Sequence, residues 1–414
     1  MPVLPGVRGN GHGVTTALAT ASPPEAPPVR RPSRTGVRFG LLGHAKALDG
    51  LRGLAVLMVV WFHFAGHHEF WGHNLLVGGW AGVDVFFCLS GFLITALLLD
   101  ERRMHGRLSL PAFWARRACR LLPALVVMLA VWVTALLVLH DQRWLATTPS
   151  GNGPGRIIDV GPALGDVAQA LLYVANWNII LGSEAPLGHL WSLAVEEQFY
   201  LLWPALLVGL LLLRTRTRLL AVGVLIACSA ALPWLYWHGG AGANRIYFGT
   251  DTRAVGLLMG AFAALVWHRR HALGRSSRFA GLRAWLGLAF VLWVAQTGRN
   301  SPQKFLLFLT LLGLAVAQLV PYLADNRGLL TRIFSVRPLV WLGKRSYALY
   351  LWHYLWATWT NPLPFWLGLA VGLAGTLLCT QVSWYAVERP ALRFGQRWAV
   401  RPTVRQRPLE ALAA

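Results

Sequence analysis

Long apolar runs are the feature of this sequence that most limits how the chain can fold. A helix needs about 17 to 25 residues, flanks included, to cross a bilayer. Ten runs approach or reach this length, at residues 48–66, 80–99, 121–139, 188–213, 219–237, 252–267, 284–297, 305–323, 338–361 and 364–387. We therefore predict an all-α integral membrane protein, built as a bundle of about ten transmembrane helices.

The composition agrees with this class and excludes others. Of the 414 residues, 56% are hydrophobic and 13% are charged, so the chain is too apolar to be disordered. A net charge of +22 would suit a nucleic-acid binder, but such a protein would be densely charged and would not contain 21 tryptophans. We expect the lipid bilayer as a partner and no nucleic acid. The four cysteines lack metal-ligand spacing, and we expect neither a metal nor a bound cofactor.

Positive charge predicts the orientation of the spans. With ten spans and both termini in the cytoplasm, 32 Lys and Arg residues fall on the inner side and 6 on the outer side. The positive-inside rule requires this asymmetry of a multi-pass protein in the plasma membrane. A further run at 168–181 is shorter and contains two asparagines. Because a span there would move an arginine cluster outside, we predict a re-entrant or interfacial segment.

Three regions follow along the chain. Residues 1–43 are rich in Pro, Gly and Arg, cannot bury a core, and are expected to form a disordered cytoplasmic tail. Residues 44–390 hold the transmembrane domain, and residues 391–414 form a second basic cytoplasmic tail.

Ionisable residues inside predicted spans are costly and therefore point to function. Those in or at the ends of spans are Asp49, Arg52, His63, Asp84, Glu196, Glu197, Arg253 and His353. Arg52 and His63 are eleven residues apart on the first span, so they share one helix face and are separated by about 16 Å along its axis. Asp84 has a depth similar to that of His63 and is a candidate to orient its imidazole. Structural readings stay open: Arg52 can snorkel to headgroups, His63 alone is more simply a satisfied interfacial histidine, and Asp84 can be stabilised by the dipole at a helix N-terminus.

Two further sets of polar residues share a helix face. On the fourth span, helical spacing aligns His189, Ser192, Glu196 and Tyr200, which favours Glu196 over Glu197 as a functional acid. The alternative is a structural polar network between helices. Near the inner surface, Arg116, Arg117 and Arg120 form a patch suited to phosphate, although ordinary positive-inside charge would look the same.

Seven blocks of sequence resemble the acyltransferase type 3 family of integral-membrane O-acyltransferases. They read LDGLRGLA (48–55), GVDVFFCLSGFLI (82–94), RRACRLLP (116–123), HLWSLAVEEQFY (189–200), YFGTDTR (247–253), WLGKRSYALYLWH (341–353) and VERP (387–390). The resemblance is to O-antigen and peptidoglycan acetylases. It implies transfer of an acyl group, acetyl above all, from cytoplasmic acyl-CoA to a hydroxyl of a sugar, glycan or glycosylated metabolite.

The resemblance also implies roles for individual residues. His63 matches the family's essential histidine, Glu196 matches the acid of its fourth-span block, and Asp84 is a third catalytic candidate. The residues expected at acyl-CoA are Arg52, Arg116, Arg117, Arg120, Ser90 and Gly91. Further candidates are His189, Tyr200 and His353. No esterase-like domain is expected after residue 390, so we predict a single-domain mechanism. His63 would either act as a general base or carry the acyl group itself.

Two other classes of protein compete with the enzyme. A secondary transporter of a small anionic or lipid-linked substrate would also be polytopic, but it predicts an internal repeat that this sequence lacks. A lipid-binding scaffold or receptor gives no reason for an arginine and a histidine on one helix face.

Overall fold

The structure is a computed structural model. It describes residues 41, 45–65, 68–70, 73–138, 160–182, 186–274, 277–297, 302–326 and 328–398. The predicted tail at 1–43 lies outside these residues except for residue 41, and so does the second tail beyond residue 398. Residues 391–398, predicted as the start of that tail, instead complete the last helices.

The described chain is almost entirely helical, as predicted. Its helices are α1 (Lys46–Ala65), α2 (Ala81–His105), α3 (Leu110–Val138), α4 (Val160–Leu171), α5 (Ala175–Ile180), α6 (Leu190–Leu210), α7 (Thr215–His238), α8 (Ala243–Phe248), α9 (Thr250–Ala272), α10 (Ala280–Thr297), α11 (Pro302–Ala324), α12 (Gly328–Phe334), α13 (Arg337–Lys344), α14 (Ser346–Thr360), α15 (Phe365–Val382) and α16 (Arg389–Gly395). A π-helical segment, η2 (Ser383–Glu388), joins α15 to α16, and a 3₁₀ turn, η3 (Gln396–Trp398), follows. Two short antiparallel strands, β1 (Glu69–Phe70) and β2 (His73–Asn74), follow α1.

Eight helices in the described part of the chain are long and apolar enough to cross a membrane. They include α1, α2, α3, α6 and α7, and the rest of the set is α10, α11 and the continuous run from α15 to η3. The chain is thus an all-α, multi-pass membrane protein. Two of the ten predicted spans fall outside this set, and both correspond to helices that the structure contains, α9 and α14.

The run predicted as one span at 338–361 is not one continuous helix, because the helix breaks within it. Helix α13 ends at Lys344 and α14 begins at Ser346. Arg345 lies at the break and is buried, with its Nε donating to Gln381 Oε1 at 3.0 Å and its guanidinium 4.5 Å from the Trp341 ring centroid. A buried guanidinium needs such partners, and the break lets it reach them.

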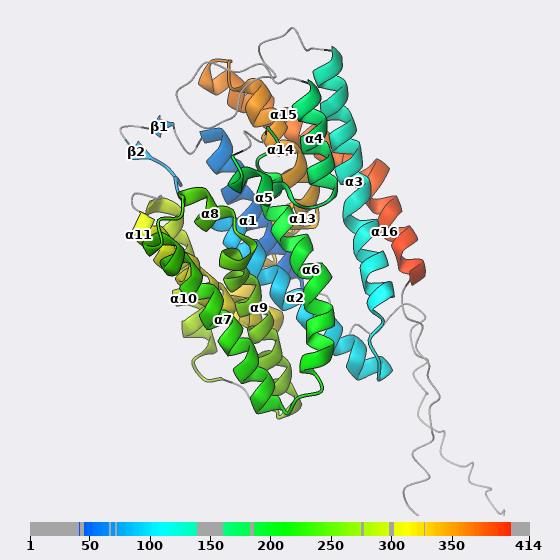
Figure 1. Cartoon of the computed structure of the whole chain (residues 1–414), viewed down its shortest axis with the longest axis vertical. Helices are drawn as coiled ribbons and strands as arrows, with labels where there is room; N and C mark the ends of the chain where they lie inside the picture. Colours follow the sequence, from blue (N-terminus) through cyan, green and yellow to red (C-terminus); the bar gives the residue numbers. More distant parts are fainter. Residues whose placement is uncertain are drawn as a thin grey trace, which may run out of the picture. The chain divides into compact units, whose positions relative to one another are not determined.

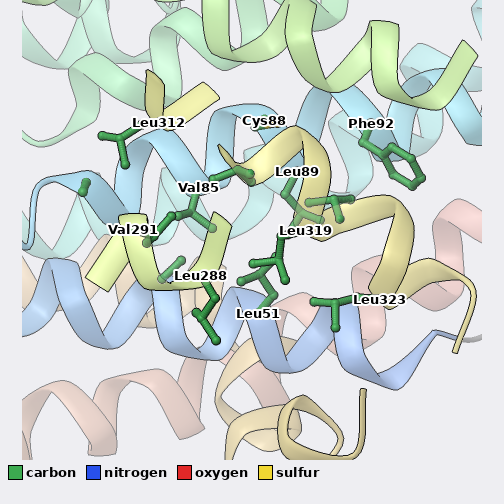
Figure 2. Close-up of a cluster of buried hydrophobic side chains, with 14 of the residues drawn as sticks. Leu51, Val85, Cys88, Leu89, Phe92, Leu288, Val291, Leu312, Leu319 and Leu323 are labelled. Carbon is green, nitrogen blue, oxygen red and sulfur yellow. The ribbon is translucent and has the colours of Figure 1, made fainter. Parts of the chain in front are cut away.

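Helices differ in how much of their surface the bundle covers. In its most apolar 18-residue window, α2 is 83% buried, whereas α7 is only 17% buried. The central helix α2 packs with α1, α10 and α11 around one apolar cluster, shown in Figure 2 with Leu51, Val85, Leu89 and Leu319 among its members. Because α7 leaves most of its leucines exposed, it is suited to contact lipid.

Glycines let α2 and α9 come close together. A side chain at Gly91 would overlap the carbonyl of Leu257, and one at Gly260 would overlap the carbonyl of Cys88. Small residues permit this backbone approach between membrane helices. Gly91, predicted at the acyl-CoA site, therefore contributes to helix packing.

The segment predicted as re-entrant or interfacial forms two short helices, α4 and α5, neither of which is a candidate span. Tyr173 separates them with a φ of 55°. Hydrogen bonds tie α5 to the bundle: Asn176 Nδ2 donates to the carbonyl of Phe248 and to Thr250 Oγ1, both at 3.0 Å. Figure 1 shows α5 beside α6, and Gln198 of α6 donates to the carbonyl of Tyr173 at 2.7 Å.

Candidate active site

Three arginines from two helices form what we call the arginine cluster, Arg52, Arg117 and Arg120. Arg52 lies on α1 and the other two lie on α3. Each of the three guanidinium groups is within electrostatic range of the other two. Like charges gathered in a partly buried place need anions nearby, either from the protein or from a ligand.

Acidic and aromatic side chains offset part of this charge. Asp49 lies 3.8 Å from Arg52, and Glu197 Oε1 lies 3.9 Å from Arg117 Nε. The guanidinium of Arg117 stacks on the ring of Tyr200, 3.8 Å from its centroid. At 3.9 Å the Glu197 contact is too long for a hydrogen bond, and Arg117 Nε has no hydrogen-bond partner among the described residues. Arg117 thus keeps a buried donor that makes no hydrogen bond within the described residues.

Glu196 lies beside the arginine cluster and joins two other predicted residues. It accepts hydrogen bonds from Ser90 Oγ at 3.0 Å and from Tyr200 Oη at 3.2 Å. It also interacts electrostatically with Arg117 and Arg52. These contacts place Glu196 at the arginine cluster, where it holds the tyrosine on which Arg117 stacks.

Arg116 is separated from the arginine cluster, although the sequence grouped the four arginines. Its guanidinium donates to Glu101 Oε2 at 2.9 Å and to the carbonyl of Trp398 at 3.1 Å. These contacts connect α3 to the end of α2 and to η3. Arg116 therefore fastens helices together and leaves the other three to face one another.

Three histidines from separate parts of the chain form what we call the histidine cluster, His63, His189 and His353. His63 is near the end of α1, His189 immediately precedes α6, and His353 is on α14. His353 Nε2 lies 3.2 Å from His63 Nδ1, and the His189 and His353 ring centroids are 5.8 Å apart. Tyr354 stacks on His189 at 4.5 Å and meets His63 edge-on at 5.2 Å. The sequence expected His189 and His353 only as further candidates, and the structure brings both to His63.

Hydrogen bonds determine which nitrogen of each ring carries a proton. His353 Nδ1 faces the carbonyls of Tyr350 and Leu349, at 2.7 and 3.2 Å, so it must donate. A neutral His353 then has its lone pair on Nε2. His63 Nδ1 faces both this lone pair and the carbonyl of Val59, at 2.9 Å, so it also carries a proton. The lone pair of neutral His63 therefore lies on Nε2, as a general base requires.

Asp84 has a different partner from the one expected. Its carboxylate pairs with Arg253 of α9 at 3.2 Å, and both side chains are buried. The rings of Phe87, Trp191 and Tyr247 surround the guanidinium, with centroids at 5.3, 5.1 and 5.1 Å. The predicted contact with His63 is thus replaced by an ion pair that joins α2 to α9.

Arg245 lies in α8, the short helix that connects α7 to α9. Arg245 of α8 donates to Asp251 at 2.7 and 2.8 Å and to Tyr236 Oη at 2.9 Å. The hydrogen bond to the Asp251 carboxylate raises the pKa of Arg245 above its ordinary value. Its guanidinium also lies 5.2 Å from the Trp177 ring centroid, which fastens α5 to this corner.

The polar face predicted on α6 is confirmed as interior, since His189, Ser192 and Tyr200 are all buried. Sequence reasoning missed two members of the site, Tyr350 and Tyr354. Tyr350 Oη donates to the carbonyl of His189 at 2.7 Å and also bonds Ser192 Oγ. The signal available in the sequence was their nearness to His353: Tyr350 lies three residues before it and Tyr354 one residue after it. Among the described residues, no group of three or more His, Cys, Asp or Glu side chains is placed to hold a metal ion.

Comparison with known families agrees with this architecture. The sequence profile of a family described as an acyltransferase domain matches residues 45–385, which is most of the chain. The chain belongs to this acyltransferase family. The match includes both clusters and all the helices that carry them.

Curated relatives of this acyltransferase include two bacterial proteins. One is "Peptidoglycan O-acetyltransferase OatA" of Listeria monocytogenes, 34% identical over 85% of this chain and 56% of its own length. Another is "Putative peptidoglycan O-acetyltransferase YrhL" of Bacillus subtilis, 35% identical over 84% of this chain and 55% of its own. The chain thus spans about half the length of these relatives. No solved structure matches it significantly.

Proposed function

We propose that this protein is an O-acyltransferase that moves an acetyl group from cytoplasmic acetyl-CoA to a hydroxyl of a glycan at the plasma membrane. One observation carries the proposal: helix α1 joins the two clusters, with Arg52 at one and His63 at the other. Eleven residues of helix separate them by about 16 Å. A pantetheine arm has a similar reach, so a nucleotide held at the arginines would present its thioester near the histidines.

The arginine cluster supports the donor half of this proposal. CoA carries phosphates at the nucleotide end, and guanidinium groups bind phosphate oxygens through paired N–H donors. The Arg117 guanidinium stacks on the Tyr200 ring, which holds its plane in one orientation. Arg52 and Arg120 add charge from two directions. The acceptor half rests on the relatives, whose names specify peptidoglycan.

The chemistry follows from the tautomer of His63. Nε2 takes the proton of the acceptor hydroxyl, and the oxygen attacks the thioester carbonyl carbon. The tetrahedral intermediate then collapses, the C–S bond breaks, and the imidazolium returns its proton to the departing thiolate. The products are an ester and free CoA, and His63 ends neutral. An acyl-histidine intermediate is the rival route, and it would need the same lone pair.

Binding of radiolabelled CoA to the protein in lipid nanodiscs tests the donor site. Arg117→Ala and Arg120→Ala each remove a charge-assisted contact, and we expect about tenfold or greater loss of affinity. Arg103→Ala removes the same charge from an exposed position on α2 and is the matched control. Equal affinity in all three variants, or no binding by the wild type, would contradict the proposed donor.

A further inference from the structure

His353 is the most deeply buried member of the histidine cluster. Its side chain is fully excluded from solvent, and its Nδ1 proton is held by the carbonyls of Tyr350 and Leu349. Only Nε2 remains to interact with another group, and it lies 3.2 Å from Nδ1 of His63. His63 itself is half-buried, and His353 contacts its ring with centroids 5.0 Å apart.

We propose that His353 is a positioning residue for His63: a neutral, buried imidazole that fixes the tautomer of the base and accepts a hydrogen bond from its protonated form. The inference rests on the proposed function, in which His63 is the base. A carboxylate often fills this place in hydrolases. In this chain the carboxylate of Asp84 pairs with Arg253, and the carboxylate of Glu196 accepts hydrogen bonds from Ser90 and Tyr200.

Proton positions during transfer follow from this arrangement. Before the reaction, Nδ1–H of His63 points to His353 Nε2 and to the carbonyl of Val59. When Nε2 of His63 takes the hydroxyl proton, the Nδ1–H bond becomes charge-assisted and stronger. No proton needs to pass to His353, because its own Nδ1 proton stays on the backbone carbonyls. The proton on His63 Nε2 is then given to the thiolate, and both rings return to their starting state.

The surroundings of His353 support a neutral imidazole there. The side chains packed around it are Tyr350, Tyr354 and His189, together with His63. None of these carries a formal negative charge in its ordinary state, and a buried charge without a counterion is costly. His189 has no hydrogen-bond partner for either ring nitrogen among the described residues, and its ring stacks on Tyr354, so it contributes contact rather than charge.

Two substitutions separate positioning from packing. In His353→Gln, the side-chain amide reaches the place of Nε2 and keeps an acceptor for His63. In His353→Asn, the shorter amide reaches the place of Nδ1, which keeps the backbone hydrogen bond and leaves His63 without its acceptor. The assay is acetyl transfer from radiolabelled acetyl-CoA to a soluble muropeptide in nanodiscs. We expect kcat to fall at least about tenfold in the Asn variant, with little change in KM for acetyl-CoA, and to recover in the Gln variant.

Equal kcat values for the Gln and Asn variants would overturn the positioning role. A measurement on the wild type keeps the test valid if a variant does not fold: histidine-selective ¹⁵N NMR, with the His63 signals identified from the spectrum of His63→Gln. We expect a proton on Nδ1 of His63 and none on Nε2, and the opposite tautomer would refute the inference. The proposed function fails separately, through full transfer by His63→Ala.

Discussion

Replacing Asp84 by leucine leaves Arg253 as a buried cation without its counterion. Both side chains are buried, with exposed fractions of 5% for Asp84 and 0% for Arg253. Removing one partner of a buried ion pair costs about 3–5 kcal/mol. The aromatic rings around Arg253 remain in the variant and still contact the guanidinium, which favours the lower end of this range. We therefore expect a net loss of about 3 kcal/mol.

Removing both charges tests the same reasoning from the other side. The double variant Asp84→Leu/Arg253→Met has no buried charge, and we expect it to recover most of the lost stability, because apolar replacements of buried pairs are often neutral. Since Asp84 contacts Arg253 instead of His63, the double variant should also recover acetyl transfer.

Unfolding of each variant in detergent micelles, followed by tryptophan fluorescence as SDS is added, measures these differences in stability. A single variant as stable as the wild type would refute the energetic argument. A double variant that recovers stability but not activity would refute the structural role, and it would return Asp84 to the orienting role that the sequence predicted for it.

The remaining predictions concern the arginine cluster and the packing of α2. In Tyr200→Phe the ring over Arg117 remains and the hydrogen bond to Glu196 is lost, so we expect stability to fall by about 1 kcal/mol and CoA affinity to change by less than about threefold. Tyr200→Leu also removes the ring, and we expect it to lower the affinity for CoA further. Equilibrium binding of CoA measures both changes in affinity. Gly91→Leu should abolish the monodisperse peak in size-exclusion chromatography, because the side chain would overlap the α9 backbone, whereas Gly209→Leu faces open space and should be tolerated.

Apolar run length predicted most of the bundle, because a membrane helix must be both long and apolar. The failure at 338–361 came from the same rule. An apolar average is insensitive to one arginine, yet Arg345 lies at the helix break and contacts Trp341 on α13 and Gln381 on α15. The count of inner and outer charges likewise gave an orientation, which stays a prediction.

For the candidate site, sequence spacing worked within a helix and failed between helices. It placed Arg52 and His63 on one face of α1 and predicted the interior face of α6, since both follow from helical geometry. It paired Asp84 with His63 from similar depth alone, but depth does not give the rotation of a helix about its axis. The partner that Asp84 takes, Arg253, is 169 residues away, and only the folded bundle brings the two together.

Acetyl transfer by His63→Ala is the most direct test of the central claim, that a histidine on α1 activates a hydroxyl toward a thioester held by arginines on α1 and α3. The measurement uses radiolabelled acetyl-CoA and a soluble muropeptide, with wild type and variant in the same nanodiscs. We expect the wild type to transfer acetyl groups and the variant to do so at a rate at least about a hundredfold lower. The affinity for CoA should be the same in the variant as in the wild type. Transfer by the variant at the wild-type rate would contradict the account.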